Sequence, residues 1–202
     1  MTTDAVNKHQ MRTAQTRSRL LKAAEEVFIQ EGYEAAQLDE IAKRAKRSKG
    51  SVYGIFESKE DLFFELVEHK LRDYMSKLDT LLRDTTDAKS RTTVLRASYV
   101  IESADANWPL LLLEFKLYAV RHKRSKIRFK RILDVFHEFE IRYPTEEAFG
   151  FRRFPASVFS ARVDILGSVA SAISLAATMN PEVLSPEIRE KILGSFFDAI
   201  TQ

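Results

Sequence analysis

The sequence contains no cysteine, and this absence excludes two classes of protein. A chain without cysteine has no disulfide framework and no thiolate metal site. Its four histidines also lack the spacing of a metal-binding helix motif such as His-x-x-x-His. The sequence has no glycine-rich phosphate loop, and no serine lies in a nucleophile motif. It therefore predicts no catalytic residue, no metal ligand and no cofactor, and the protein is not expected to be an enzyme.

Signals for secretion or membrane insertion are also missing. The N-terminus is polar and lacks the apolar core of a secretory signal. The most apolar stretch, residues 165–179, is rich in serine, alanine and glycine and is too short to span a bilayer. We therefore expect a cytoplasmic protein without a membrane partner. The net charge is only +3, so any affinity for nucleic acid must come from local patches.

What the sequence does have is helical periodicity along most of its length. The 202 residues are 45% hydrophobic and 30% charged, a soluble globular profile with enough length for one or two cores. No useful strand alternation and no internal repeat occurs. These observations predict an all-α fold.

The most informative stretch is residues 36–62, where two short amphipathic helices are expected. Apolar residues recur at helical spacing in two groups: Leu38, Ile41, Ala42 and Ala45, then Val52, Ile55 and Phe56. Two short helices joined by a tight turn form a helix-turn-helix, whose second helix can lie in the DNA major groove. Five cations surround the turn, opposed within residues 36–56 only by Asp39 and Glu40: Lys43, Arg44, Lys46, Arg47 and Lys49.

The order of these elements resembles the N-terminal DNA-binding domain of the tetracycline-repressor (TetR) family. The resemblance covers about residues 16–63. It is carried by Phe28 with Gly32-Tyr33, then Ile41-Ala42, then Ser48-Lys49-Gly50-Ser51-Val52-Tyr53-Gly54-Ile55-Phe56, then Ser58-Lys59-Glu60-Asp61-Leu62. It implies an all-α protein with an N-terminal three-helix helix-turn-helix domain and a C-terminal helical ligand-binding and dimerisation domain. We place these domains at residues 1–57 and 58–202.

Two positions depart from the family pattern. Lys46 stands where the family usually has a glycine with positive φ, so we expect a strained backbone there. Ile55 stands where the family often has a histidine or tyrosine that helps to hold a phosphate. Either the phosphate clamp is weaker in this chain, or Lys46 and Arg47 replace it.

The resemblance also implies which residues meet DNA. Tyr53 is either a core aromatic or a hydroxyl donor to phosphate, and the family motif favours the donor. Lys59, otherwise an ordinary surface lysine, begins the next helix and is expected near a phosphate. Ser48 caps the recognition helix in either interpretation. The full predicted DNA-binding set is Lys46, Arg47, Ser48, Lys49, Gly50, Ser51, Tyr53 and Lys59.

Helix signals predict the remaining organisation. The first helix is expected to begin at Thr13 or Thr16, after a mobile arm of residues 1–12, and to end at Gly32. A long helix should follow Ser58 to about residue 83. Further helices are predicted over 88–106, from Trp108, over 124–141, over 156–179 and from Ser185, with a loop over 142–155.

Two features of the C-terminal part have both a functional and a structural interpretation. Aromatic and apolar residues of the middle helices are either simple core or, as the resemblance implies, the lining of an effector pocket: Trp108, Leu112, Phe115, Tyr118, Phe136, His137 and Phe139. Residues 121–131 carry seven Lys or Arg and no acid. This run is either a solvated face or a site for an anionic effector, such as an acyl-CoA or phosphate ester, or for nucleic acid.

The last two helices suggest a dimer. Small residues alternate with apolar ones over 157–179, and the final helix has more apolar surface than a lone terminal helix needs. We therefore expect an isologous four-helix interface that includes Val163, Gly167, Ser171, Ser174, Ile192 and Phe196. The rival interpretation is that both helices close the core of a monomer.

Together these features predict a ligand-responsive transcriptional repressor. It should be a homodimer that binds a palindromic double-stranded DNA operator and is released by a small-molecule effector of unknown identity. Activation in place of repression fits the same residues. The alternative from another class is a helical ligand-binding or enzymatic protein whose helix-turn-helix is only a packing unit.

Overall fold

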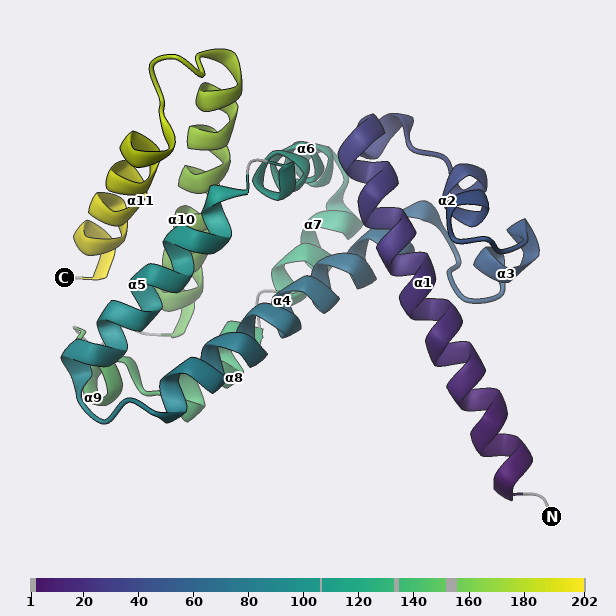
Figure 1. The fold of residues 1–202 in the computed structure, drawn as a ribbon, viewed down its shortest axis with the longest axis horizontal. Coiled ribbons are helices and arrows are strands. Elements are labelled where there is room, and N and C mark those ends of the chain that lie inside the picture. Colours follow the sequence, from purple (N-terminus) through teal and green to yellow (C-terminus); the bar gives the residue numbers. More distant parts are fainter. Residues whose placement is uncertain (1–2, 106, 133–134, 152–155, 202) are drawn as a thin grey trace. The chain divides into compact units, whose positions relative to one another are not determined.

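A computed structural model describes residues 3–105, 107–132, 135–151 and 156–201 of the chain (Figure 1). The described residues form eleven helices and no strand, which confirms the predicted all-α class. They belong to two compact units, Met1–His69 and Lys70–Gln202, and α4 runs from the first into the second. In chain order the helices are α1 (Thr3–Ala35), α2 (Leu38–Arg44), α3 (Lys49–Tyr53), α4 (Lys59–Arg83), α5 (Ala88–Ala104), α6 (Asn107–Arg121), α7 (Lys123–Ile132), α8 (Val135–Arg142), α9 (Thr145–Phe149), α10 (Ala156–Met179) and α11 (Pro186–Thr201).

The first unit is built around an aromatic core. Phe28 of α1 meets Phe63 of α4 edge to face, with the ring centroids 5.1 Å apart, and Tyr33 makes a second edge-to-face contact with Phe63 at 5.1 Å. Ile41 of α2 and Val52 of α3 are fully buried in the same unit. Packed aromatic pairs hold their neighbours in a narrow range of geometries. This core therefore fixes the two short helices, and the turn between them, on α1 and α4.

The start of α1 differs from the prediction. Thr13 and Thr16 lie inside the helix and not at its beginning, and the helix already exists at Thr3. No proline or glycine precedes Gly32, so nothing in the sequence stops the helix from extending toward the N-terminus. The predicted arm is therefore wrong over residues 3–12. Gly32 itself has φ 77° and leaves the helical conformation, as predicted for a residue without a side chain.

The second unit is held together by pairs of helices. Arg96 of α5 donates from Nε to Asp198 of α11 at 2.8 Å. Lys116 of α6 donates from Nζ to Asp164 of α10 at 2.7 Å. A small apolar cluster fills the space among α5, α10 and α11, and its buried members are Val100, Ala170 and Leu193. The position of α10 between α6 and α11 decides which of its faces is left for a partner.

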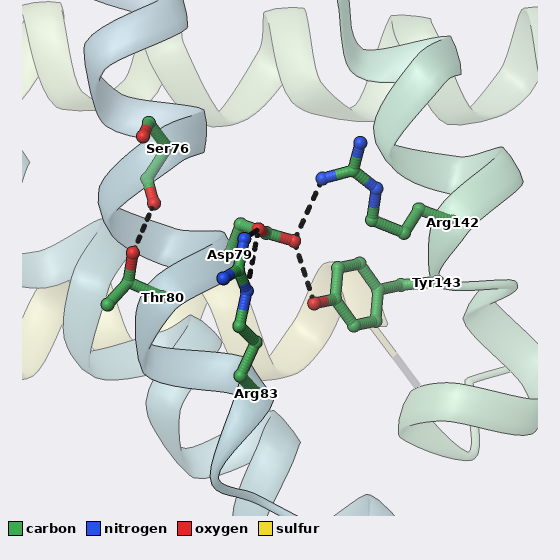
Figure 2. A network of polar contacts seen from close by, with 6 residues as sticks. All are labelled: Ser76, Asp79, Thr80, Arg83, Arg142 and Tyr143. Atoms are coloured by element: carbon green, nitrogen blue, oxygen red, sulfur yellow. Dashed lines mark hydrogen bonds and ion pairs between the residues drawn. The ribbon is translucent and has the colours of Figure 1, made fainter.

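A buried carboxylate ties α4 to the end of α8 (Figure 2). Asp79 Oδ2 accepts from Arg83 Nη2 at 2.7 Å, one turn further along α4. Its other oxygen accepts from Arg142 Nη1 at 3.0 Å and from the Tyr143 hydroxyl at 2.9 Å. The three donors stabilise the charged form and lower the pKa of Asp79 to about 2. The carboxylate is thus charged at neutral pH and joins segments that lie far apart in the sequence.

Two predicted segments of the second unit need correction. The continuous helix expected over 124–141 is two helices, α7 and α8, and residues 133–134 between them lie outside the described part of the chain. The loop expected over 142–155 contains the short helix α9. Phe149 of this helix is buried against Leu82 of α4, and this long-range contact stabilises a turn of helix that local signals did not predict.

Candidate nucleic-acid interface

The turn between α2 and α3 depends on one left-handed residue. Lys46 has φ 55°, which makes it the one non-glycine residue with positive φ among those described. The sequence predicted this strain from the missing glycine, and the prediction is confirmed. The Arg47 amide then donates to the Ala42 carbonyl at 2.9 Å and closes the end of α2. The chain can therefore reverse direction within a few residues and present α3 beside α2.

Ser48 starts α3 in the way that its predicted role as a cap requires. Its Oγ accepts a hydrogen bond from the Ser51 amide at 3.2 Å, and the hydroxyl oxygens of Ser48 and Ser51 lie 2.9 Å apart. A side-chain acceptor at this position satisfies one of the open amides of the first turn. Both serines therefore contribute to the start of the helix, and the Ser48 side chain is exposed at the surface.

The two sides of α3 have opposite characters. Val52, together with Phe56 just after the helix, is fully buried against the rest of the unit. Lys49 and Gly50 are exposed, and the ring of Tyr53 is 51% exposed. Tyr53 is therefore not a core aromatic, and its hydroxyl is available to an outside acceptor. An exposed helix face with a lysine, a glycine and a tyrosine can approach a phosphate backbone closely.

Lys49 has a partner that the sequence analysis did not identify. Its Nζ donates to Asp39 Oδ2 at 2.8 Å, and each side chain is 60% exposed. The hydrogen bond to this carboxylate raises the pKa of Lys49, with the opposite charge of Asp39 adding to the effect. Lys49 Nζ also lies 5.9 Å from the centroid of the Tyr53 ring. Because Asp39 belongs to α2 and Lys49 to α3, helical spacing alone could not reveal this ion pair.

Lys59 is anchored at the first turn of α4. Its Nζ donates to the Glu34 carbonyl at 2.7 Å and lies 5.0 Å from the centroid of the Tyr33 ring. Ser58 caps the helix by accepting from the Asp61 amide at 3.0 Å. These contacts hold the ammonium group in one place beside the positive end of the helix dipole. The predicted phosphate role stays a prediction.

The charge around the turn is smaller than the sequence suggests. Glu40 pairs with Lys43 at 3.5 Å and with Arg44 at 3.8 Å, and Asp39 pairs with Lys49, so three of the five cations are partly neutralised. Within the described part of the chain, neither Lys46 nor Arg47 takes part in an ion pair. The uncompensated positive charge is thus concentrated at the turn itself, at the pair proposed to replace the missing phosphate clamp.

The predicted effector residues divide into separate groups. Phe115 is fully buried, and its ring centroid lies 5.8 Å from that of Tyr118 and 6.3 Å from that of Phe129, which the sequence analysis missed. Phe139 belongs to the different cluster around Leu78, Leu82 and Phe149. The His137 side chain is 56% exposed. Leu112 and Trp108 are half-buried, with Lys70 Nζ 5.0 Å from the Trp108 ring, and Phe136 is buried.

The small residues of α10 face the inside of the chain. Ser171 is fully buried, and its hydroxyl donates to the Pro109 carbonyl of α6 at 2.8 Å. Ser174 is buried as well, and Gly167 lies under Lys116. Ser171 and Ser174 are therefore enclosed within this unit, which corrects their expected position at a surface between subunits, whereas the interface role of Gly167 stays a prediction. Val163 and Ile192 are half-buried, whereas Phe196 is 45% exposed.

A different face of α10 is the one that is exposed. Ile165, Leu175 and Met179 are 49%, 47% and 72% exposed. At 3.6 residues per turn these three positions fall on one side of the helix. The segment Ala161–Met179 is also long and apolar enough to cross a membrane by length and composition. The prediction that the most apolar stretch is too short to span a bilayer is therefore wrong. Only 22% of that segment is buried within the chain.

Within the described residues, no group of three or more His, Cys, Asp or Glu side chains is arranged to hold a metal ion.

Comparison with known proteins connects the first unit to a family. The family model described as bacterial regulatory proteins of the tetR family matches residues 20–66. The transcriptional activator FasR of Mycolicibacterium smegmatis is 43% identical to this chain over 75 residues, which cover 37% of this chain and 34% of FasR. The match therefore spans about a third of the relative's length.

Solved structures extend the likeness in fold to most of the chain. The fatty acid degradation regulator FadR of Bacillus halodurans superposes with a TM-score of 0.69 at 16% identity, over 92% of this chain and 94% of FadR. FadR of Bacillus subtilis in complex with stearoyl-CoA gives a TM-score of 0.59 at 17% identity, over 92% and 97%. At such low identity these structures support the fold, and the chemistry has to come from this chain's own residues.

Proposed function

We propose, because the chain belongs to the TetR family of bacterial regulatory proteins, that it is a DNA-binding transcriptional regulator that responds to a small-molecule ligand. In the specific form proposed, it is a cytoplasmic repressor. A homodimer holds a palindromic operator, and an effector releases it. Residues 1–57 would bind the operator, and residues 58–202 would bind the effector and form the dimer.

One observation carries the DNA-binding part of this proposal: the exposed side of α3. The inner side of this five-residue helix is fully buried at Val52, whereas its outer side is exposed and can meet a partner. That outer side presents Lys49, Gly50 and the Tyr53 hydroxyl, while Lys46 and Arg47 add unpaired charge at the turn. Major-groove readers place side chains near the start of the recognition helix on base edges, and they use the flanking groups on phosphates.

Selection from a random pool of duplex DNA tests this proposal. The full chain should enrich a palindromic sequence, and binding should weaken steeply as salt rises. Tyr53→Phe removes only a hydroxyl. If that hydroxyl donates to a phosphate, operator affinity should fall by about tenfold to a hundredfold, since a hydrogen bond to a charged group contributes roughly 1.5–3 kcal/mol. The matched control is Lys43→Gln on α2, where the side chain is 81% exposed and affinity should hardly change. Absence of any enriched sequence would refute the proposed function.

For the effector, we propose an acyl-CoA as the first ligand to test. Support comes from the B. subtilis FadR structure with stearoyl-CoA and from the aromatic group of Phe115, Tyr118 and Phe129 in this chain, of which Phe115 and Phe129 are buried. A ligand that binds only the folded protein raises its melting temperature. Stearoyl-CoA should do so, and coenzyme A without the acyl chain should not. Equal shifts with both compounds, or none with either, would remove acyl-CoA as the effector.

The proposed coupling has a second test that uses reciprocity. An effector that lowers operator affinity by a given factor must have its own affinity lowered by the same factor when operator is bound. Titration of the ligand with and without operator duplex measures one factor, and titration of operator with and without ligand measures the other. A reporter gene under the selected operator then separates repression from activation, because a ligand that releases the protein raises expression in the first case and lowers it in the second. Equal ligand affinity in both titrations would show that no coupling exists.

A further inference from the structure

The helix α7 carries positive charge that the proposed operator site does not use. Its core-facing side chains are Ser125, Phe129 and Ile132, which are buried. At 100° per residue, the exposed side chains cover an arc of about 160° on the opposite side. That arc, here called the α7 basic face, consists of Lys123, Arg124, Lys126, Ile127, Lys130 and Arg131.

The cations of the α7 basic face have no acidic partner among the residues that the structure describes. Elsewhere in the same unit cations are paired: Arg96 with Asp198 at 2.8 Å, and Lys77 with Glu102 at 3.7 Å. Like charges one turn apart on a helix destabilise it by about 0.2–0.5 kcal/mol per pair. Such a helix is therefore retained at a cost to stability, and an external polyanion would remove the repulsion.

The shape of the face decides the size of the partner. It is the outer, convex side of a helix, so it cannot enclose a small anion. A single exposed ion pair contributes only about 0.2–1 kcal/mol, which is too little to hold one phosphate ester. An extended polyanion engages several cations at once and releases its condensed counterions. From Lys123 to Arg131 the helix rises about 12 Å, a length over which duplex DNA carries about seven phosphate charges.

The side chains on the face favour duplex nucleic acid over the other polyanions. Helices that bind membranes insert their apolar side, but Phe129 and Ile132 are buried in the core and only Ile127 lies among the cations. Proteins that bind single strands stack bases on aromatic rings, and the α7 basic face has none. What remains is the phosphate backbone of a double helix, which needs charge and no aromatic platform.

We propose that the α7 basic face is a second, sequence-independent contact surface for the backbone of double-stranded DNA. The inference rests on the proposed function only in that duplex DNA is already the partner. It assigns the face no role in operator choice. It predicts that the full chain binds random-sequence duplex with more phosphate contacts than the helix-turn-helix provides.

The test compares two variants of the full chain with the same change in charge. Lys126→Gln/Lys130→Gln removes two cations from the face, and Lys77→Gln/Lys89→Gln removes two exposed lysines from α4 and α5. Affinity for a random-sequence duplex is measured as a function of salt concentration. The first variant should show a salt slope shallower by about two units, since each lost phosphate contact removes roughly 0.9. The control should keep the wild-type slope, and helical circular dichroism should match in all three proteins.

Several results would overturn the inference. An unchanged slope in the first variant, or no binding of random duplex by the wild type, shows that the face does not meet DNA. Loss of binding to phosphatidylglycerol vesicles with an unchanged DNA slope assigns the face to lipid, and loss of stearoyl-CoA binding assigns it to the effector. The proposed function fails in a different way, by the absence of an enriched operator in the selection. If the wild type enriches an operator while Lys126→Gln/Lys130→Gln keeps the wild-type salt slope on random-sequence duplex, only this inference is refuted.

Discussion

Gly50 lies inside α3, where a glycine weakens the helix and none of the described neighbours requires one. A Cβ atom at this position would meet only Ser48 Oγ, at an ordinary distance of 3.9 Å. Glycine in a helix is less stable than alanine by roughly 0.5–1 kcal/mol. Since the described residues give no reason for this glycine, we propose that it leaves room for DNA at this exposed face. Gly50 is thus the residue at which stability and DNA binding should conflict.

We predict that Gly50→Ala stabilises the protein and weakens operator binding. Thermal unfolding should show a gain of up to about 1 kcal/mol. Operator affinity should fall by about tenfold or more, because an added methyl group at a tight contact costs on the order of 1–3 kcal/mol. Lys43→Ala, at an exposed position of α2, is the control and should leave affinity unchanged. A stabilised Gly50→Ala protein with full operator affinity would show that DNA does not come close to this residue.

Lys46 shows the opposite relation between residue type and backbone. A side chain at φ 55° is strained by roughly 1–2 kcal/mol, whereas glycine adopts this conformation freely. Glycine also makes the unfolded chain more disordered, which offsets part of the gain. Lys46→Gly should therefore be neutral or stabilising by up to about 1 kcal/mol in thermal melts. Lys43→Gly, in the regular part of α2, should instead cost about 1 kcal/mol. A clear loss of stability for Lys46→Gly would mean that its side chain makes contacts that outweigh the strain.

At the scale of helices, most of the fold was predictable because helix ends carry local chemical signals. Ser48, Ser58 and Ser185 each accept a backbone hydrogen bond at a helix start, and Gly32 leaves the helix with positive φ. What local signals could not supply is the choice between two faces of one helix. The small residues of α10 could pack against α6 or against a second subunit, and only the burial of Ser171 decides it. The ion pair of Lys49 with Asp39 was missed for a related reason, since Asp39 lies on another helix and local spacing does not show which helices meet.

The carboxylate of Asp79 joins α4 to α8, and its pKa makes this junction sensitive to acid. The folded pKa of about 2 lies below the ordinary value of 3.8. The charged form therefore contributes stability that is fully present above about pH 4 and is lost as pH falls toward 2. Asp79→Asn lacks this contribution at every pH. The difference in melting temperature between wild type and Asp79→Asn should thus be large at pH 6 and shrink between pH 4 and pH 2.

Asp84→Asn provides the matched control for this prediction. It removes a carboxylate near the end of the same helix without touching Arg142 or Tyr143. Its melting temperature should follow that of the wild type across the acid range more closely than that of Asp79→Asn does. A constant difference between wild type and Asp79→Asn from pH 6 to pH 2 would show that the amide loses packing and not charge, and the network in Figure 2 would then be of no electrostatic importance.

At the scale of the whole molecule, the apolar surface of α10 and α11 stays exposed among the residues that the structure describes. Ile165, Leu175 and Met179 lie on one side of α10, and Ile188 and Phe196 are 45% exposed on α11. The two helices pack against each other, so the two groups belong to the same unit. Exposed apolar residues gathered in this way favour an interface between subunits. A two-fold axis there would match the symmetry of a palindromic operator.

We therefore predict that Phe196→Asp converts the protein to a monomer without unfolding it. The neighbouring Phe197 provides the contrast, because it is only 2% exposed. Phe197→Asp should therefore unfold the unit. Sedimentation should show a dimer for the wild type at micromolar concentration and a monomer for Phe196→Asp, with the same helical circular dichroism. Operator affinity should fall steeply in the monomer, because each half-site would then be bound alone. A wild-type chain that sediments as a monomer and still binds a palindrome tightly would place the second half of the operator contact elsewhere, and the exposed face of α10 and α11 would need a different partner.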